Sequence, residues 1–191
     1  METYRLRIYY SKTGIARFIS EKNLQKIIER TLRRADVPLK YTEGFSPHPK
    51  ISFGHPLPVG VSGESECFDV YLAGKFDIPG FMDKSGEFLP EGVSFTYAER
   101  ISKDAPSINS METYARYTLE ANKELHPETL QEFGRILNID KNRAVLLIKI
   151  NNFSHKGLTG LLIDGTISSI RRNISREKQE NEQRIQNADK Q

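Results

Sequence analysis

The chain contains very little cysteine and no long apolar segment, and each shortage excludes a class of protein. Cys67 is the only cysteine among 191 residues, which excludes an internal disulfide framework, a cysteine-rich zinc site and an iron–sulfur cluster held by this chain alone. The longest purely aliphatic run covers residues 144–148, far fewer than the roughly 20 residues that a membrane-spanning helix needs. The first residues, METYRLRIYY, lack the apolar core of a signal peptide. We therefore expect a soluble, cytoplasmic protein with no membrane contact.

Recognised metal and nucleotide motifs are also missing. The sequence has no HExxH, no P-loop and no GxGxxG, and its histidines are too widely spaced for a zinc site; they are His48, His55, His126 and His155. Cys67 lies in a strand-like run without an activating neighbour, so we interpret it as a packed thiol. We expect this chain to bind no metal or cofactor of its own.

Positive charge is concentrated in the first third of the chain. Residues 1–60 contain 11 basic and 5 acidic side chains, a net of +6, whereas residues 61–110 contain 4 and 9, a net of −5. The whole chain has 28 basic and 25 acidic side chains and a formal net charge of +3. This asymmetry favours an anionic partner at one surface.

Hydrophobic periodicity predicts the order strand, helix, strand, strand, helix, strand in the first half. Strict alternation indicates half-buried strands, and apolar side chains at helical spacing indicate amphipathic helices. The strands are predicted at residues 4–10, 50–53, 67–72 and 93–97, and the helices at residues 21–35 and 78–88. Ser20 is the expected N-cap of the first helix. This order is that of the ferredoxin-like (split βαβ) fold, an antiparallel sheet with both helices on one face.

The predicted fold class is therefore α+β, with a ferredoxin-like domain followed by a smaller α/β unit. We place the first domain at residues 1–101, a linker at 102–110, and an incomplete α/β unit at 111–174. Within that unit, strands are predicted at residues 115–120, 144–150 and 158–163, and helices at residues 127–137 and 167–173. Residues 175–191 contain almost nothing to bury and are predicted to form a disordered tail.

The outer face of the helix predicted at residues 21–35 is the first candidate for binding an anion. Its basic side chains recur about every four positions and line up along one side of the helix; they are Lys22, Lys26, Arg30 and Arg33, with Arg34 toward the edge. Phosphates are the natural partner of such a row. The alternative is an ordinary solvated face, which most amphipathic helices have.

The outer side of the first strand is the second candidate. In a ferredoxin-like sheet this face would carry Arg5, Arg7 and Tyr9 beside the third strand, and such faces bind single-stranded RNA by stacking bases on aromatic rings. The alternative is that one of these arginines pairs with Asp69, or that the second unit covers the face. We favour this alternative, because the glycine- and aromatic-rich signature of the RNA-binding module is absent.

The third candidate is the loop at residues 41–50. Prolines on both sides of His48 restrict its backbone and that of its neighbours, so the loop can present His48 and Lys50 with little loss of entropy on binding. An imidazole can contact phosphate or transfer a proton. The alternative is a rigid connector whose histidine bonds to a nearby carbonyl.

Three short motifs within residues 4–100 give the chain a specific resemblance. They are Ser11-Lys12-Thr13-Gly14, Arg17-Phe18-Ile19-Ser20 and Gly44-Phe45-Ser46-Pro47-His48-Pro49-Lys50. In this order and spacing the chain resembles the radical SAM-linked protein family of bacteria, an uncharacterised domain fused to, or encoded beside, radical SAM enzymes. The family usually continues after the second motif with His-Leu-Asp, where this chain has Glu21-Lys22-Asn23, and the resemblance is weak beyond Asp140.

The resemblance implies an accessory role: binding and presenting a nucleic acid, an RNA such as tRNA or rRNA, to a radical SAM enzyme. S-adenosylmethionine and the iron–sulfur cluster would then belong to that partner. The expected anion-facing site consists of Lys12, Arg17, His48 and Lys50, and is extended along the first helix by Lys26, Arg30, Arg33 and Arg34. We expect a binding protein rather than an enzyme.

Two other functions remain open at this point. The chain could be a protein–protein adaptor for the same enzyme without RNA contact, using the acidic residues 61–110. It could also be a metal-independent ribonuclease with His48 as general base, although the glycine-rich loop of ferredoxin-like ribonucleases is absent. The sequence does not specify the substrate, the modification chemistry or the oligomeric state.

Overall fold

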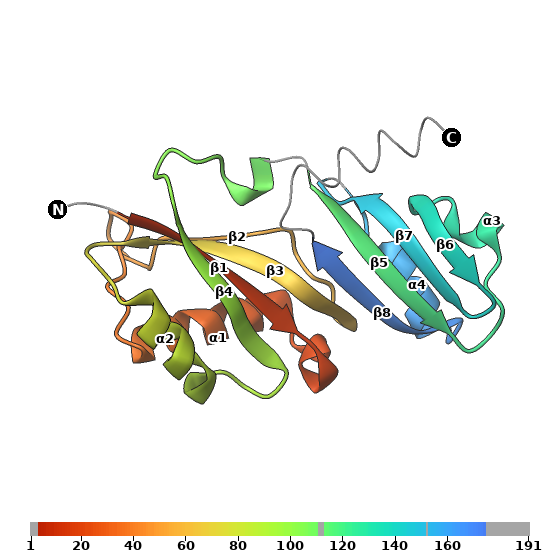
Figure 1. The fold of residues 1–191 in the computed structure, drawn as a ribbon, viewed down its shortest axis with the longest axis horizontal. Helices are drawn as coiled ribbons and strands as arrows, with labels where there is room; N and C mark the ends of the chain where they lie inside the picture. Colours follow the sequence, from red (N-terminus) through yellow and green to blue (C-terminus); the bar gives the residue numbers. More distant parts are fainter. Residues whose placement is uncertain (1–3, 111–112, 152, 175–191) are drawn as a thin grey trace.

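A computed structural model describes residues 4–110, 113–151 and 153–174. This part of the chain is a mixed α/β protein with an eight-stranded, mostly antiparallel sheet and four α-helices (Figure 1). The strands are β1 (Tyr4–Lys12), β2 (Ile51–Phe53), β3 (Val61–Leu72), β4 (Val93–Ile101), β5 (Tyr114–Ala121), β6 (Arg135–Asp140), β7 (Arg143–Lys149) and β8 (Ile167–Ile174). The helices are α1 (Glu21–Arg34), α2 (Ile78–Ser85), α3 (Pro127–Leu130) and α4 (Lys156–Ile163), with short 3-10 turns η1 (Gly14–Phe18), η2 (Gly86–Phe88) and η3 (Ile108–Ser110).

The strand order is β4-β1-β3-β8-β5-β7-β6, and β2 pairs with β3 outside this path. β3 is long enough to pair with two different strands along the same edge. Its residues Phe68, Asp69 and Val70 pair with β2, whereas Val61–Gly63 pairs with β8 in parallel. The other edge of β3 pairs with β1 in antiparallel register, with Arg7 opposite Asp69. β3 therefore connects the first half of the sheet to the second.

The elements of the first half follow the predicted order. Alternation in β1 buries Leu6, Ile8 and Tyr10 in a core that also contains apolar side chains of α1 and α2, so both helices pack on one face of these strands. Two strands are longer than predicted. β3 begins at Val61 and β4 ends at Ile101, beyond the residues that alternate most strictly.

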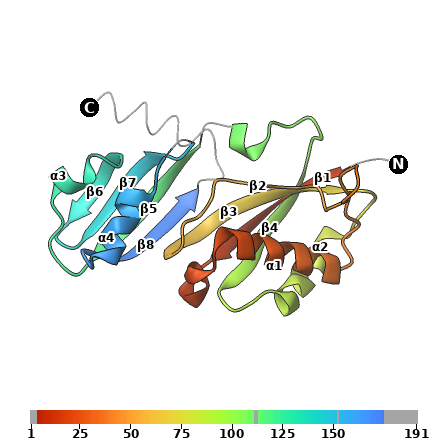
Figure 2. The same cartoon turned by 180° about the vertical axis from the view of Figure 1, so that it is seen from behind.

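The first helix begins and ends close to its predicted bounds. The Ser20 hydroxyl accepts a hydrogen bond from the Asn23 amide at 3.4 Å, which satisfies one of the free amides at the helix start. Leu24, Ile28 and Leu32 are fully buried. Because these positions share one face, the basic positions between them must point outward. Seen from behind, α1 and α4 lie in front of the sheet (Figure 2).

Three predictions for the second half are wrong. Residues 127–137 form only the single turn α3 followed by the start of β6; residues 158–163 belong to helix α4; and residues 167–173 belong to strand β8. The first of these predicted helices ends at Leu130. Gly134 lies against β7, where a Cβ would be 2.6 Å from the carbonyl oxygen of Leu147. The remaining predicted strands, at 115–120 and 144–150, are confirmed as β5 and β7.

Two of these errors, the strand predicted at residues 158–163 and the helix predicted at residues 167–173, have a physical cause. The apolar run at residues 158–163 reads as a buried strand, yet Leu158, Leu161 and Leu162 pack on the second core from one side of a helix. In β8, Ile167 and Ile170 are three residues apart because the strand has an irregularity opposite Ala121. That spacing imitates a helix.

The two halves have separate hydrophobic cores but share one sheet. The division into domains at residues 102–110 therefore stays a prediction. The predicted tail at residues 175–191 lies outside the described residues. Within the residues that the structure describes, none of the helices has the length and apolar character needed to cross a membrane.

Candidate functional site

All five basic side chains of α1 that the sequence singled out are exposed. They are Lys22, Lys26, Arg30, Arg33 and Arg34. Arg33 is paired with Glu29 at 2.8 Å in an exposed i,i+4 contact. Among the described residues, none of the other four is in an ion pair. Four of the five cations are therefore not neutralised by a carboxylate of the described chain.

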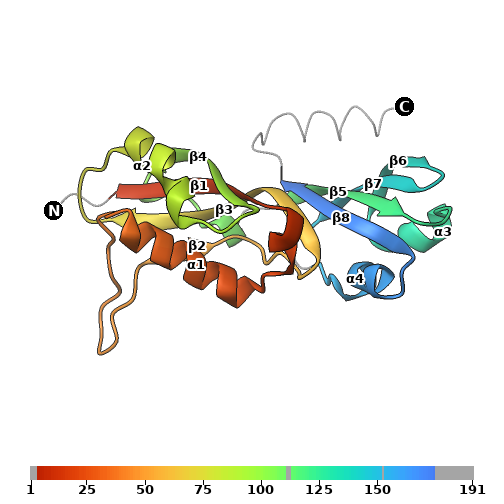
Figure 3. The same ribbon diagram turned by 90° about the horizontal axis from the view of Figure 1, so that it is seen from below.

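The loop at residues 41–50 forms a narrow hairpin that projects from the molecule beyond the end of α1 (Figure 3). Tyr41 pairs with Pro49, and the Thr42 amide donates to the carbonyl of His48 at 2.9 Å. The His48 amide in turn donates to Thr42 Oγ1 at 3.2 Å, and that oxygen also lies 3.2 Å from His48 Nδ1. At the turn, Gly44 has φ +124°, which L side chains rarely adopt.

The loop contacts α1 at its start and β3 at its end. The Arg33 guanidinium of α1 lies 5.4 Å from the centre of the Tyr41 ring, whereas the Lys50 ammonium lies 4.5 Å from the centre of the Tyr71 ring on β3. His48 and Lys50 are both exposed. The structure therefore brings the loop next to the C-terminal end of α1.

Lys12 and Arg17 lie elsewhere. Lys12 ends β1, whereas Lys50 hydrogen-bonds through its backbone to Tyr71, which is opposite Arg5 near the start of β1. The intervening length of strand is about 23 Å, so the expected cluster of Lys12, Arg17, His48 and Lys50 is not formed. The length of the nine-residue strand β1 therefore separates Lys12 and Arg17 from His48 and Lys50.

Lys12 is also fully buried and does not face solvent. Its ammonium donates to the carbonyl of Ile19 at 3.0 Å. Burial lowers the pKa of Lys12, and the carboxylates of Glu21 and Glu66 oppose this effect. Arg17 is half-buried, with its guanidinium 4.8 Å from the ring centre of Phe18. These contacts give Lys12 a structural role in tying β1 to η1.

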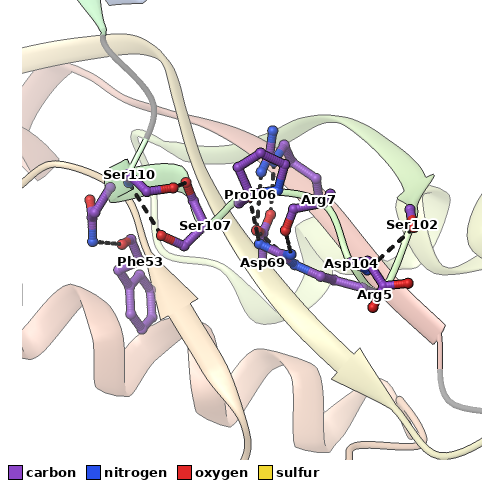
Figure 4. Close-up of polar contacts among 11 residues, drawn as sticks. Arg5, Arg7, Phe53, Asp69, Ser102, Asp104, Pro106, Ser107 and Ser110 are labelled. Atoms are coloured by element: carbon purple, nitrogen blue, oxygen red, sulfur yellow. Dashed lines mark hydrogen bonds and ion pairs between the residues drawn. The ribbon is translucent and has the colours of Figure 1, made fainter.

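The outer face of β1 is filled by ion pairs. Asp69, which is fully buried, accepts from Arg7 Nε at 2.8 Å and from Arg5 Nε at 3.1 Å. Arg5 also donates to the carbonyls of Ala105 and Pro106 in the segment that crosses this face (Figure 4). Both arginines thus contact Asp69, as the alternative interpretation expected.

Tyr9, the third candidate on this face, donates its hydroxyl to Glu99 Oε1 at 3.0 Å. Burial, together with the Glu99 carboxylate, raises the pKa of Tyr9 to about 12. Its ring lies 5.8 Å from that of Tyr97 on β4. The contacts on this face are therefore internal to the protein.

Sequence reasoning missed a buried ion pair between the two halves. Arg172 of β8 is fully buried and donates from Nε to Glu66 Oε1 of β3 at 2.8 Å. Its terminal nitrogens donate to the carbonyls of Pro56 and His55 at 3.0 and 2.9 Å. No local pattern marks Arg172, because its partner is 106 positions away.

Two histidines and a tyrosine line the same junction. The Tyr117 hydroxyl lies 2.7 Å from His155 Nε2, and the Arg172 guanidinium lies beside Tyr117. Since a guanidinium only donates, the Tyr117 hydroxyl is the acceptor in its contact with Arg172. Burial, together with Arg172 and His55, lowers the pKa of His155 to about 4. His55 Nε2 is buried without a hydrogen-bond partner among the described residues.

Acidification is expected to destabilise the protein through His155. Its pKa in the folded state, about 4, lies below the ordinary 6.5, so the unfolded chain binds the proton more tightly. The stabilisation is complete above the unfolded pKa and is lost as the pH falls through the folded value. We expect a loss of about 1–2 kcal/mol, because solvent partly screens the ring.

Urea unfolding as a function of pH tests this expectation. The His155→Gln variant keeps a polar group for Tyr117 but does not titrate, so its stability should fall less steeply between about pH 7 and pH 4. An identical pH dependence in the variant and the native chain would contradict the role assigned to His155.

The other candidate groups, the Cys67 thiol, possible metal ligands and His48, show no arrangement for catalysis among the described residues. Burial raises the pKa of the Cys67 thiol to about 12, so the reactive thiolate is scarce near neutral pH. In the described ranges, no group of three or more histidine, cysteine, aspartate or glutamate side chains could hold a metal ion. Around His48, the described hydrogen bonds are those within its own loop.

Comparison with known proteins places most of the chain within one family. Residues 5–164 match the family model DUF2344, described as an uncharacterized protein conserved in bacteria. No curated protein matches the chain. The match spans both halves of the sheet and includes α1 and the loop at residues 41–50.

Proposed function

Because the chain belongs to the DUF2344 family of uncharacterized bacterial proteins, we propose its function from the charge and geometry of its surface. The protein binds RNA through the exposed cations of α1 and the adjoining loop. This surface, the helix–loop surface, consists of Lys22, Lys26, Arg30, Arg33, Arg34, His48 and Lys50. The observation that carries the proposal is that four of the five α1 cations have no carboxylate partner in the described chain.

The dimensions of the surface favour a polymer over a small anion. From Lys22 to Arg34 the helix rises by about 18 Å, which corresponds to roughly five phosphates of one strand at about 3.4 Å each. The charges lie along a convex helix rather than converging on a point. A single phosphate would contact one or two of them, whereas a nucleic-acid backbone contacts the whole row.

Neutralising the row is expected to weaken RNA binding strongly. Replacement of Lys22, Lys26, Arg30 and Arg34 by glutamine removes about four phosphate contacts, so affinity should fall by roughly 10- to 100-fold at moderate salt. The slope of log affinity against log salt should become less negative by about three. Filter binding with a structured RNA between about 50 and 200 mM salt measures both quantities.

A matched control separates position from net charge. Glutamine at Lys84, Lys123, Lys141 and Arg143, all exposed and outside the helix–loop surface, changes the net charge by the same amount. The control variant should keep nearly native affinity and salt slope. Equal losses in the two variants would contradict a localised binding surface.

We also propose an accessory role for the chain, acting in the cytoplasm beside a radical SAM enzyme. Support comes from the three motifs that resemble the radical SAM-linked family, one of which forms the projecting loop. The single cysteine, Cys67, cannot supply the ligands of an iron–sulfur cluster. The cluster and S-adenosylmethionine would be bound by the partner, and this chain would present the RNA substrate.

Co-purification tests this role and separates it from the adaptor alternative. A radical SAM enzyme that remains bound after nuclease treatment supports the accessory role. If that complex forms but the isolated chain has no RNA affinity, the chain is a protein–protein adaptor. Absence of such an enzyme from purified complexes would contradict the accessory role.

We further assign residues 4–101 to the ferredoxin-like arrangement. The order β4-β1-β3-β2, with antiparallel neighbours, supports the assignment, as does the packing of α1 and α2 on one face. In this arrangement α1 covers the sheet and leaves its basic side to solvent. An experimental structure with parallel pairing between any of these neighbours would contradict it.

A further inference from the structure

We propose that Phe45 stacks on an unpaired nucleobase, so that the helix–loop surface selects single-stranded or looped RNA over a duplex. This inference rests on the proposed function and adds the class of RNA that is recognised. It concerns the exposure of Phe45, which neither charge nor hydrogen bonding explains.

Phe45 is the most exposed large apolar side chain of the described residues. Its exposed fraction is 112 %, compared with 41 % for Tyr41 in the same loop. The value above 100 % means that the residue is as open to solvent as it would be in an extended peptide. Phe45 therefore contributes no packing to the fold.

The loop holds this ring away from the molecule. The backbone and side-chain bonds between Thr42 and His48 close the hairpin below the tip. The positive φ of Gly44 makes the turn immediately before Phe45, and Pro47 and Pro49 restrict the returning strand. A ring at the end of a closed, proline-restricted hairpin loses little backbone entropy when it binds a partner.

The surroundings of the ring favour an anionic partner over an apolar one. The loop joins the C-terminal end of α1 through Arg33 and Tyr41, and Lys40 and Lys50 are exposed at its base. Across residues 41–50 the single acidic residue is Glu43. An exposed aromatic ring on a loop whose base adjoins a row of cations is a combination that single-stranded nucleic acids bind: cations follow the backbone and the ring stacks on a base.

Bases in a duplex are already stacked and paired, so the ring cannot reach a base face there. Phe45→Ala is therefore expected to lower affinity for an unstructured RNA strand by about 5- to 160-fold, the range found for base–aromatic stacking. Affinity for the corresponding duplex should change by less than about twofold. The salt slope should be unchanged, because no charge is removed.

The chain contains no tryptophan, which gives a direct spectroscopic test of stacking. Phe45→Trp keeps an aromatic ring and should retain single-strand affinity, and its fluorescence should be quenched when the strand binds. The control is Ile163→Trp. This position is 87 % exposed and lies on helix α4, which packs against the second half of the sheet. Its fluorescence should not change on binding.

The outcomes separate the two proposals. If the native full chain binds neither strand nor duplex, both the proposed function and this inference are wrong. If the chain binds RNA but Phe45→Ala binds strand and duplex as well as the native chain does, only the stacking inference is wrong. Unquenched fluorescence of Phe45→Trp in a saturated complex would likewise overturn stacking alone.

Discussion

Replacing Arg172 by methionine is expected to lower the free energy of unfolding by about 3–5 kcal/mol. The substitution leaves the carboxylate of Glu66, which is 2 % exposed, without its counter-ion. It also leaves the carbonyls of His55 and Pro56 without the donor that they share. Chemical denaturation of the native chain and the variant measures the difference.

The adjacent residue provides a matched control. Arg171 is half exposed and lies 3.3 Å from Glu64 at the surface, so Arg171→Met should change stability by less than about 1 kcal/mol. The double variant Glu66→Gln with Arg172→Met removes both charges and should be more stable than Arg172→Met alone. Similar losses for Arg171→Met and Arg172→Met would show that the buried pair does not hold the two halves together.

Asp69→Asn is expected to cost about 3–5 kcal/mol. Asp69 is the shared carboxylate of Arg5 and Arg7, whose side chains are 3 % and 12 % exposed. Asparagine has nearly the same size, so the change removes the negative charge without opening a cavity. Two adjacent guanidinium groups would then remain poorly solvated and without a counter-charge.

Asp83→Asn makes the same chemical change at an exposed position of α2, and should alter stability by less than about 0.5 kcal/mol. Urea unfolding of both variants gives the comparison. Because Arg5 also bonds to residues 105 and 106, limited proteolysis should cut this segment faster in Asp69→Asn. Native-like stability of Asp69→Asn would contradict the role of the cluster.

The first half of the fold could be predicted because its strands and helices each have one buried face. β1 alternates between core residues such as Leu6 and Ile8 and outward residues, and α1 buries every third or fourth residue. The second half departs from this regularity. An irregularity in β8 gives helical spacing to a strand, and a short apolar run gives no period that separates a helix from a strand.

The candidate site also has a part that could be predicted from the sequence and a part that could not. The row of cations on α1 depends only on helical spacing and on the burial of Leu24 and Ile28, so it could be predicted locally. The placement of Lys12 could not, because its burial depends on how η1 folds back over the end of β1. The pairing of Arg172 with Glu66 requires knowledge that β8 lies parallel to β3, which no local pattern contains.

Equilibrium binding of the native full chain to a structured RNA with unpaired loops, measured at two salt concentrations, tests the central claim most directly. We expect measurable affinity at low salt and a logarithmic salt slope of about −3 to −5, as five to seven phosphate contacts would give. A chain that binds no RNA at low salt, or binds with affinity independent of salt, would contradict the helix–loop surface as an RNA-binding surface.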